Sequence, residues 1–207
     1  MRRPLLLALS AGLLLAACTG TESLEDEAAA IGEELGDDWQ AQVVDDAREG
    51  RFVLASPVDA EVWLVGDPTD ALAEATAGTA WSGFWLPALE GATADTSNVR
   101  AVVADTGSIP QQVVSWQVNV NPDDPGLELG AEDLAADLRT RFTDQGLEVV
   151  EARTTSWDDR EIALVAFEVP EELFGGEARY IRQWFFAEGE PAAMWSFSCD
   201  APADPDL

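Results

Sequence analysis

The sequence contains no lysine and no histidine. All 11 basic residues are arginine, against 40 aspartates and glutamates, and the formal net charge is −29. These two absences exclude a histidine base, histidine metal ligands, a Schiff-base lysine and a phosphate-cradling lysine. The large negative charge also repels nucleic acid and anionic lipid headgroups, so we expect no nucleic-acid partner. The hydrophobic content of 47% in 207 residues is still sufficient for one ordinary folded domain.

A short apolar run opens the chain. Arg2 and Arg3 precede this run, which ends in LAAC at Cys18 and is too short to span a bilayer as a permanent helix. The tetrapeptide resembles the lipobox of bacterial lipoproteins. The resemblance implies that residues 1–17 are a cleaved signal peptide and that Cys18 carries a diacylglycerol thioether and fatty acyl chains such as palmitate. An ordinary secretory signal with a chance cysteine is the alternative.

The leader also predicts where the rest of the chain resides. Two or more acyl chains give stable anchoring, because each buried methylene contributes about 0.8 kcal/mol. We therefore expect a monomer held to the cell membrane by lipid on Cys18, with its body on the extracytoplasmic face. Residues 18–30 are predicted to be an acidic tether, 31–199 a single domain and 200–207 a disordered tail.

Cysteine is scarce, and the two that exist do not suggest a disulfide. With Cys18 assigned to lipid, Cys199 is left alone. Strand alternation places Cys199 on one face with Trp195 and Phe197. A reactive thiol needs a basic or cationic neighbour, and the chain has no histidine to supply one. We expect a buried, unreactive thiol.

The pattern of apolar residues predicts mostly strands. They are expected at 40–44, 51–55, 61–65, 99–103, 113–120, 147–154, 161–169, 178–187 and 193–199. The first three have connections too short for crossovers, so we expect them to form an antiparallel meander.

The best helix is predicted over 131–145. Leu134, Leu138 and Phe142 recur at four-residue spacing, and Gly146 follows the last turn. Shorter helices are expected through 28–35 and over 70–75. The resulting fold class is α+β, a mostly antiparallel sheet with one long amphipathic helix packed on it.

The order of elements from about 113 to 199 carries a resemblance. Its parts are VVSWQVNV, AEDLAADLRTRF, GLEVVEARTT, EIALVAFEV, YIRQWFFAEG and AMWSFSC. This segment resembles the α/β sandwich domain shared by photosystem PsbP subunits and the Ran-binding Mog protein. It is also similar to the LpqN type of actinobacterial lipoproteins, in which a lipobox precedes such a domain. The resemblance implies a binding or accessory role and supplies no catalytic residues.

Eight tryptophans make aromatic residues the main candidates for binding. Those within apolar strands are predicted to pack in the core; they are Trp63, Trp116, Trp184 and Trp195. The irregular segment 76–98 carries Trp81, Phe84 and Trp85, which we take as a candidate binding surface, because loops held by a rigid sheet collect binding residues. The alternative is that these rings fasten the loop to the sheet.

Two classes of function remain open. The first is a non-catalytic binding or accessory module for a protein or peptide. The second is a carboxylate-based hydrolase or a sugar-binding protein that acts on cell-envelope glycans. The chain has four pairs of adjacent aspartates, and none lies in an EF-hand loop; the pairs are Asp37-Asp38, Asp45-Asp46, Asp123-Asp124 and Asp158-Asp159. The chain also lacks a serine elbow with a histidine. We therefore expect no catalytic residues, no metal site and no cofactor.

Overall fold

The computed structural model of the chain describes residues 23–67, 70–78, 98–105, 114–157, 160–172, 178–189 and 192–203. These residues form two compact units, divided after Ala60. The sequence did not predict the division, because only a short turn joins the two predicted strands on either side of it.

The first unit is a helix packed on a hairpin. Helix α1 (Leu24–Leu35) lies on strands β1 (Trp39–Asp46) and β2 (Gly50–Pro57), which pair antiparallel. The contact is apolar, because every third or fourth residue of α1 faces the hairpin. The buried residues of this cluster are Ala28, Ile31, Val53 and Ala55.

Helix α1 begins where a side chain can cap it. The hydroxyl of Ser23 accepts a hydrogen bond from the Asp26 N–H at 3.2 Å. Gly36 ends the helix at a φ of 86°, in the left-handed region that glycine tolerates. Half of the segment 18–30, expected to be a tether, is therefore helical.

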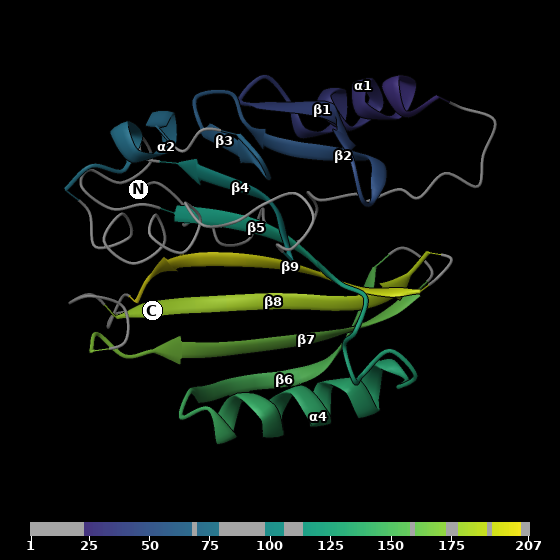
Figure 1. The fold of residues 1–207 in the computed structure, drawn as a ribbon, viewed down its shortest axis with the longest axis vertical. Coiled ribbons are helices and arrows are strands. Elements are labelled where there is room, and N and C mark those ends of the chain that lie inside the picture. The colour runs from purple at the N-terminus through teal and green to yellow at the C-terminus, as the bar shows by residue number, and fades with distance from the viewer. Residues whose placement is uncertain are drawn as a thin grey trace. The chain divides into compact units, whose positions relative to one another are not determined.

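The second unit is built on one seven-stranded sheet (Figure 1). All strands pair antiparallel, in the order β3-β4-β5-β9-β8-β7-β6. Their bounds are β3 Glu61–Leu64, β4 Val99–Asp105, β5 Val114–Asn121, β6 Glu148–Trp157, β7 Arg160–Val169, β8 Arg179–Glu188 and β9 Ala193–Pro202. Helices α2 (Asp70–Ala75) and α4 (Ala131–Asp144) belong to the same unit. The fold class is α+β with an antiparallel sheet.

Strand β9 occupies the centre of this sheet. Strands β3, β4 and β5 form one meander, after which the chain crosses through α4 to the opposite edge. Strands β6, β7, β8 and β9 return as a second meander. The last strand of the second meander pairs with the last of the first, with Val118 opposite Phe197. The two halves of the sheet are thus joined by a pairing between distant segments.

Strand β3 corrects one expectation. It pairs with β4, with Trp63 opposite Val102, and does not continue a meander from β1 and β2. Pro57 at the end of β2 has no N–H to donate. The N–H of Val58 goes to the carbonyl of Asp38 at 3.1 Å, which closes the hairpin at that point. A short connection permits antiparallel pairing but does not impose it.

A buried ion pair joins β8 to β9. The Nε of Arg179 lies 2.7 Å from an oxygen of Asp200, and their side chains are 0% and 1% exposed. Arg179 is opposite Pro202, so Asp200 lies two residues along β9 on the same face. The strand therefore extends three residues beyond the predicted end at 199, into the segment expected to be a disordered tail.

Helix α4 covers one face of the sheet, which we call the helix-covered face. Leu134, Ala135 and Leu138 are buried in the same cluster as odd-numbered residues of β7 and β8. The ring of Phe142 completes the contact, with its centroid 4.7 Å from that of Phe167. Trp63 is 2% exposed and belongs to this cluster, which confirms its predicted place in the core.

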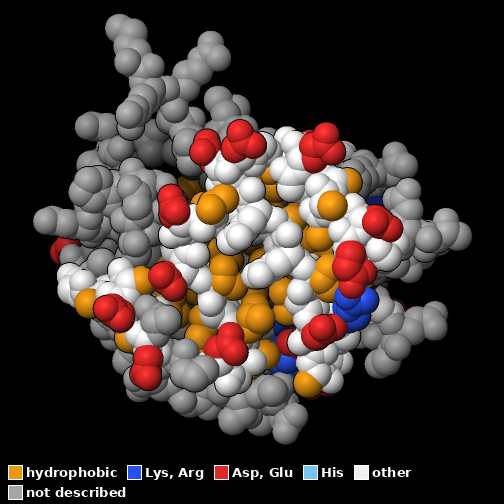
Figure 2. All heavy atoms as spheres, turned by 90° about the horizontal axis from the view of Figure 1, so that it is seen from above, with side chains coloured by type: hydrophobic (Ala, Val, Ile, Leu, Met, Phe, Trp, Pro, Cys, Tyr) orange, Lys and Arg blue, Asp and Glu red, His pale blue; other side chains and the backbone are white. Residues whose placement is uncertain are grey.

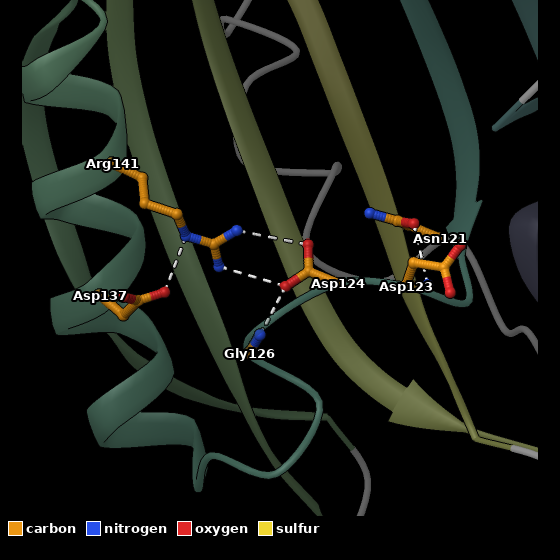
Figure 3. A network of polar contacts seen from close by, with 6 residues as sticks. All are labelled: Asn121, Asp123, Asp124, Gly126, Asp137 and Arg141. Atoms are coloured by element: carbon orange, nitrogen blue, oxygen red, sulfur yellow. Dashed lines mark hydrogen bonds and ion pairs between the residues drawn. The ribbon is translucent and has the colours of Figure 1, made fainter.

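The loop before α4 is fastened to the helix by carboxylates (Figure 3). Asp124 accepts the N–H of Gly126 at 2.8 Å and two hydrogen bonds from Arg141 at 3.3 and 3.4 Å. Asp137, one turn earlier, lies 2.7 Å from the Nε of Arg141. A Cβ on Gly126 would lie 2.6 Å from Leu134 Cδ1, so a larger residue here would have to displace the buried Leu134 side chain.

The two main helices, α1 and α4, differ less in length than the sequence predicted. α4 has 14 residues, against a predicted range of 131–145, and α1 has 12. No single long helix stands out among the described residues, because both units use a helix of about three to four turns to cover a strand pair.

We expect the substitution Leu138→Ala to lower the free energy of unfolding by about 2–5 kcal/mol, because it leaves a cavity beneath α4. Leu138 is 1% exposed, whereas its neighbour Arg139 is exposed. Arg139→Ala is the matched control, with an expected change within about half a kcal/mol. Urea denaturation measures both. Equal effects of the two variants would show that Leu138 does not hold α4 to the sheet.

Candidate functional site

The residues that the sequence analysis proposed as sites lie outside the described residues. These are the lipidation site Cys18 and the candidate binding surface Trp81, Phe84 and Trp85. The described part of the chain presents a different aromatic surface, on the sheet face opposite α4.

This surface, here called the aromatic strip, consists of alternate residues of β8 with one neighbour on β9. Its members are Tyr180, Arg182, Trp184, Phe186 and Trp195. Alternation places the even-numbered residues of β8 on one face, and the register puts Trp195 opposite Phe186. All five side chains are half-buried, so each presents part of its surface to solvent.

The aromatic strip rests on buried side chains. Trp184 stacks on Phe197, with ring centroids 5.5 Å apart and planes 24° from parallel. Across β7, Leu164 lies directly opposite Trp184 and is also buried. The indole of Trp184 is therefore flanked by buried side chains on both neighbouring strands.

An arginine network borders the aromatic strip. The Nε of Arg153 lies 2.6 Å from one oxygen of Glu151, and an Nη of Arg182 lies 3.6 Å from the other. The same Nη is 3.4 Å from the hydroxyl of Tyr180. Glu151 and Arg182 are two strands apart, with Ala166 between them in register. The small alanine leaves space for the two long side chains to meet above it.

Part of this surface differs from what the sequence predicted. Trp184 and Trp195 were expected in the core, and both are half-buried at the aromatic strip. The signal was present in the run Trp184-Phe185-Phe186, because three consecutive aromatics on a strand cannot all face the same side. Phe185 takes the core position. The side chain of Trp116 lies outside the described part.

Many acidic side chains of the described residues are exposed, as expected from the net charge. Figure 2 shows carboxylates spread over the face in view, with few arginines. Two of the acidic pairs also hold turns. Asp46 accepts the N–H groups of Arg48 and Glu49, both at 2.9 Å, and Asp124 pairs with Arg141. Asp158 and Asp159 are not among the described residues.

Cys199 lies behind Arg182 on the same face, directly opposite it in register. The thiol is free and buried, which agrees with the predicted lack of a disulfide. Burial raises its pKa to about 12, and the negative charge of Asp200 adds to the rise, against the opposing charges of Arg182 and Arg179. Such a thiol holds its proton and is not a nucleophile at neutral pH.

Within the described ranges no group of three or more metal-ligating side chains comes together. No helix in the same ranges is long and apolar enough to cross a membrane. The arrangement that remains is a fixed aromatic surface with two guanidinium groups at its border, suited to non-covalent recognition.

Solved structures include chains that are similar to this one. No protein-family model matches the chain, and no curated protein matches its sequence. The solution structure of cyanobacterial PsbP (CyanoP) from Synechocystis sp. PCC 6803 is similar, with 13% identity and a TM-score of 0.42. The match covers 93% of this chain and 88% of that one. The likeness is one of fold alone and transfers no ligand, partner or activity.

Thiol titration tests the environment of Cys199. In a Cys18→Ser chain, Cys199 is the remaining cysteine, and we expect it to react with a thiol reagent only after denaturation. The proton held by the folded thiol contributes to stability below pH 9.0, the unfolded value, and this contribution is lost as the pH rises toward about 12. Rapid reaction of the native protein in mildly alkaline buffer would contradict the buried position.

Proposed function

We propose that this protein is a lipid-anchored, non-catalytic binding module of the cell envelope that recognises a protein or peptide. The observation that carries the proposal is the aromatic strip. Partly exposed tryptophan, tyrosine and arginine side chains on a rigid sheet are the groups that dominate binding energy at protein interfaces. Aromatic rings also lose few rotamers when a partner buries them.

The proposed anchor is Cys18, at the end of the lipobox-like LAAC sequence. We propose that the chain is similar to LpqN-type lipoproteins, in which a leader of this kind precedes a domain with this order of strands and helices. The lipid would hold the body at the extracytoplasmic face of the membrane. Anionic headgroups would repel the acidic body, which would keep it in solution beside the membrane.

The charge of the body also favours certain partners. With a net charge of −29, the protein repels anionic macromolecules at long range and attracts neutral or cationic ones. We propose a neutral or basic protein or peptide as the partner. Trp81, Phe84 and Trp85 are proposed, from the sequence, as a second part of the binding surface.

Lipidation is tested by metabolic labelling. Cells that express the protein and receive a labelled fatty acid should incorporate label into the wild type and not into Cys18→Ser, because the thiol is the acceptor of the lipid. The wild type should also sediment with membranes. Equal labelling of the two proteins would rule out Cys18 as the anchor.

Partner recognition is tested by crosslinking in intact cells. We expect Trp184→Ala to lose a crosslinked partner that the wild type captures, because the substitution removes the central ring of the aromatic strip. The double variant Trp81→Ala, Trp85→Ala should reduce capture of the same partner at an unchanged thermal midpoint.

Leu138→Ala is the control for lost stability in that assay, since Leu138 is buried beneath α4 on the other face of the sheet. It should retain capture by its folded fraction. If Leu138→Ala loses the partner as fully as Trp184→Ala does, the effect reports stability and the aromatic strip is not the binding surface.

A further inference from the structure

We infer that the partner presents a carboxylate group to Arg182 and Arg153 at the border of the aromatic strip. The inference rests on the proposed function, because it assumes that the aromatic strip is a binding surface. It adds the chemistry of the contact, which the net charge of the protein would not suggest.

The first observation is the local balance of charge. Glu151 is shared by two guanidinium groups, those of Arg153 and Arg182. At two other arginines the ratio is reversed. Arg51 contacts both Glu25 and Asp45, and Arg141 contacts both Asp124 and Asp137. Two guanidinium groups thus share one carboxylate within the Glu151 network, while Glu168, opposite Tyr180 in register, and Glu148, opposite Glu168, lie on the same face.

The second observation is unused hydrogen-bonding capacity. A guanidinium has five donors, yet the contacts of Arg182 run through one Nη, at 3.4 Å to Tyr180 and 3.6 Å to Glu151. Its Nε is buried and donates no hydrogen bond to any described residue. The side chain is nevertheless 35% exposed, and that of Arg153 is 52% exposed. Both groups can therefore reach an acceptor on a partner.

The third observation is the setting of Arg182. Its guanidinium carbon lies 5.9 Å from the centroid of the Tyr180 ring, and Trp184 is the next residue along the same face. The buried Cys199 lies directly opposite Arg182 in register, and the Nε of Arg182 is itself buried. A charge-assisted hydrogen bond is stronger in such a site than in open solvent.

A carboxylate fits this site better than other acceptors, because its two oxygens match the fork of a guanidinium. The acidic surface does not forbid the contact, since salt screens charges beyond about 8 Å at physiological ionic strength. The partner segment must be attracted to an acidic protein at long range and must also contact the guanidinium groups locally. Such a segment is neutral or basic as a whole and carries a single carboxylate beside an apolar or aromatic side chain.

A matched pair of small ligands tests the inference on the purified full chain. N-acetyltryptophan carries an indole and a carboxylate, whereas N-acetyltryptophanamide carries the same indole and no charge. Without a local cationic site, the net charge of −29 would make the amide the better ligand. We expect the opposite in an NMR titration, with the carboxylate binding at least about tenfold more tightly.

Variants then assign the preference to its residues. Arg182→Gln should remove the preference for the carboxylate while leaving binding of the amide unchanged, and Arg182→Lys should restore part of it. Arg139→Gln, at an exposed position of α4, is the matched loss of one positive charge and should keep the full preference.

The inference is overturned if the amide binds as tightly as the acid, if neither ligand binds at millimolar concentration, or if Arg182→Gln retains the preference. None of these results bears on whether Cys18 is lipidated or on whether Trp184→Ala loses a partner in cells. The carboxylate contact can thus fail while the lipid-anchored binding module stands.

Discussion

The pairing of β9 with strands on both sides is the constraint on which the second unit depends. It brings β5 beside a strand that follows it only after α4, β6, β7 and β8. The buried pair of Arg179 and Asp200 lies at the end of this strand. Two charges removed from water are tolerated only when each satisfies the other, and removing one partner from such a pair typically costs several kcal/mol. The pair therefore penalises any register in which β8 and β9 do not meet as they do here.

The same strand supplies the support for the candidate site. Phe197 of β9 stacks against Trp184, and Cys199 lies directly opposite Arg182 in register. On the other face, α4 fills the core through Leu134 and Leu138. The aromatic strip is thus held by packing on its own face and by the helix layer on the opposite one. Its arginines are placed by register, since Ala166 is the residue that lies between Arg182 and Glu151.

Most elements could be predicted from the sequence because they depend on local patterns. The continuous apolar run in β7 and the four-residue spacing in α4 are visible without knowledge of neighbours. Strand pairing is not determined locally. Strand β3 pairs with β4 and not with β2, and the residues of the turn after Pro57 do not predict this. The site was harder still. Its tryptophans were noticed, but the role of Arg182 follows from residues on three other strands, whose registers the sequence does not reveal.

The central position of β9 has a consequence for the order in which the molecule can acquire its structure. The chain emerges from the ribosome with β9 as the last of the described strands, so the inner edges of both meanders stay open until residues 193–202 appear. Contacts this far apart in sequence form slowly, because loop closure must precede any gain from pairing. A nascent chain whose sheet is incomplete can still pass through a translocation channel. If the apolar leader does direct export, the protein would cross the membrane as an extended chain and complete its fold only on the far side.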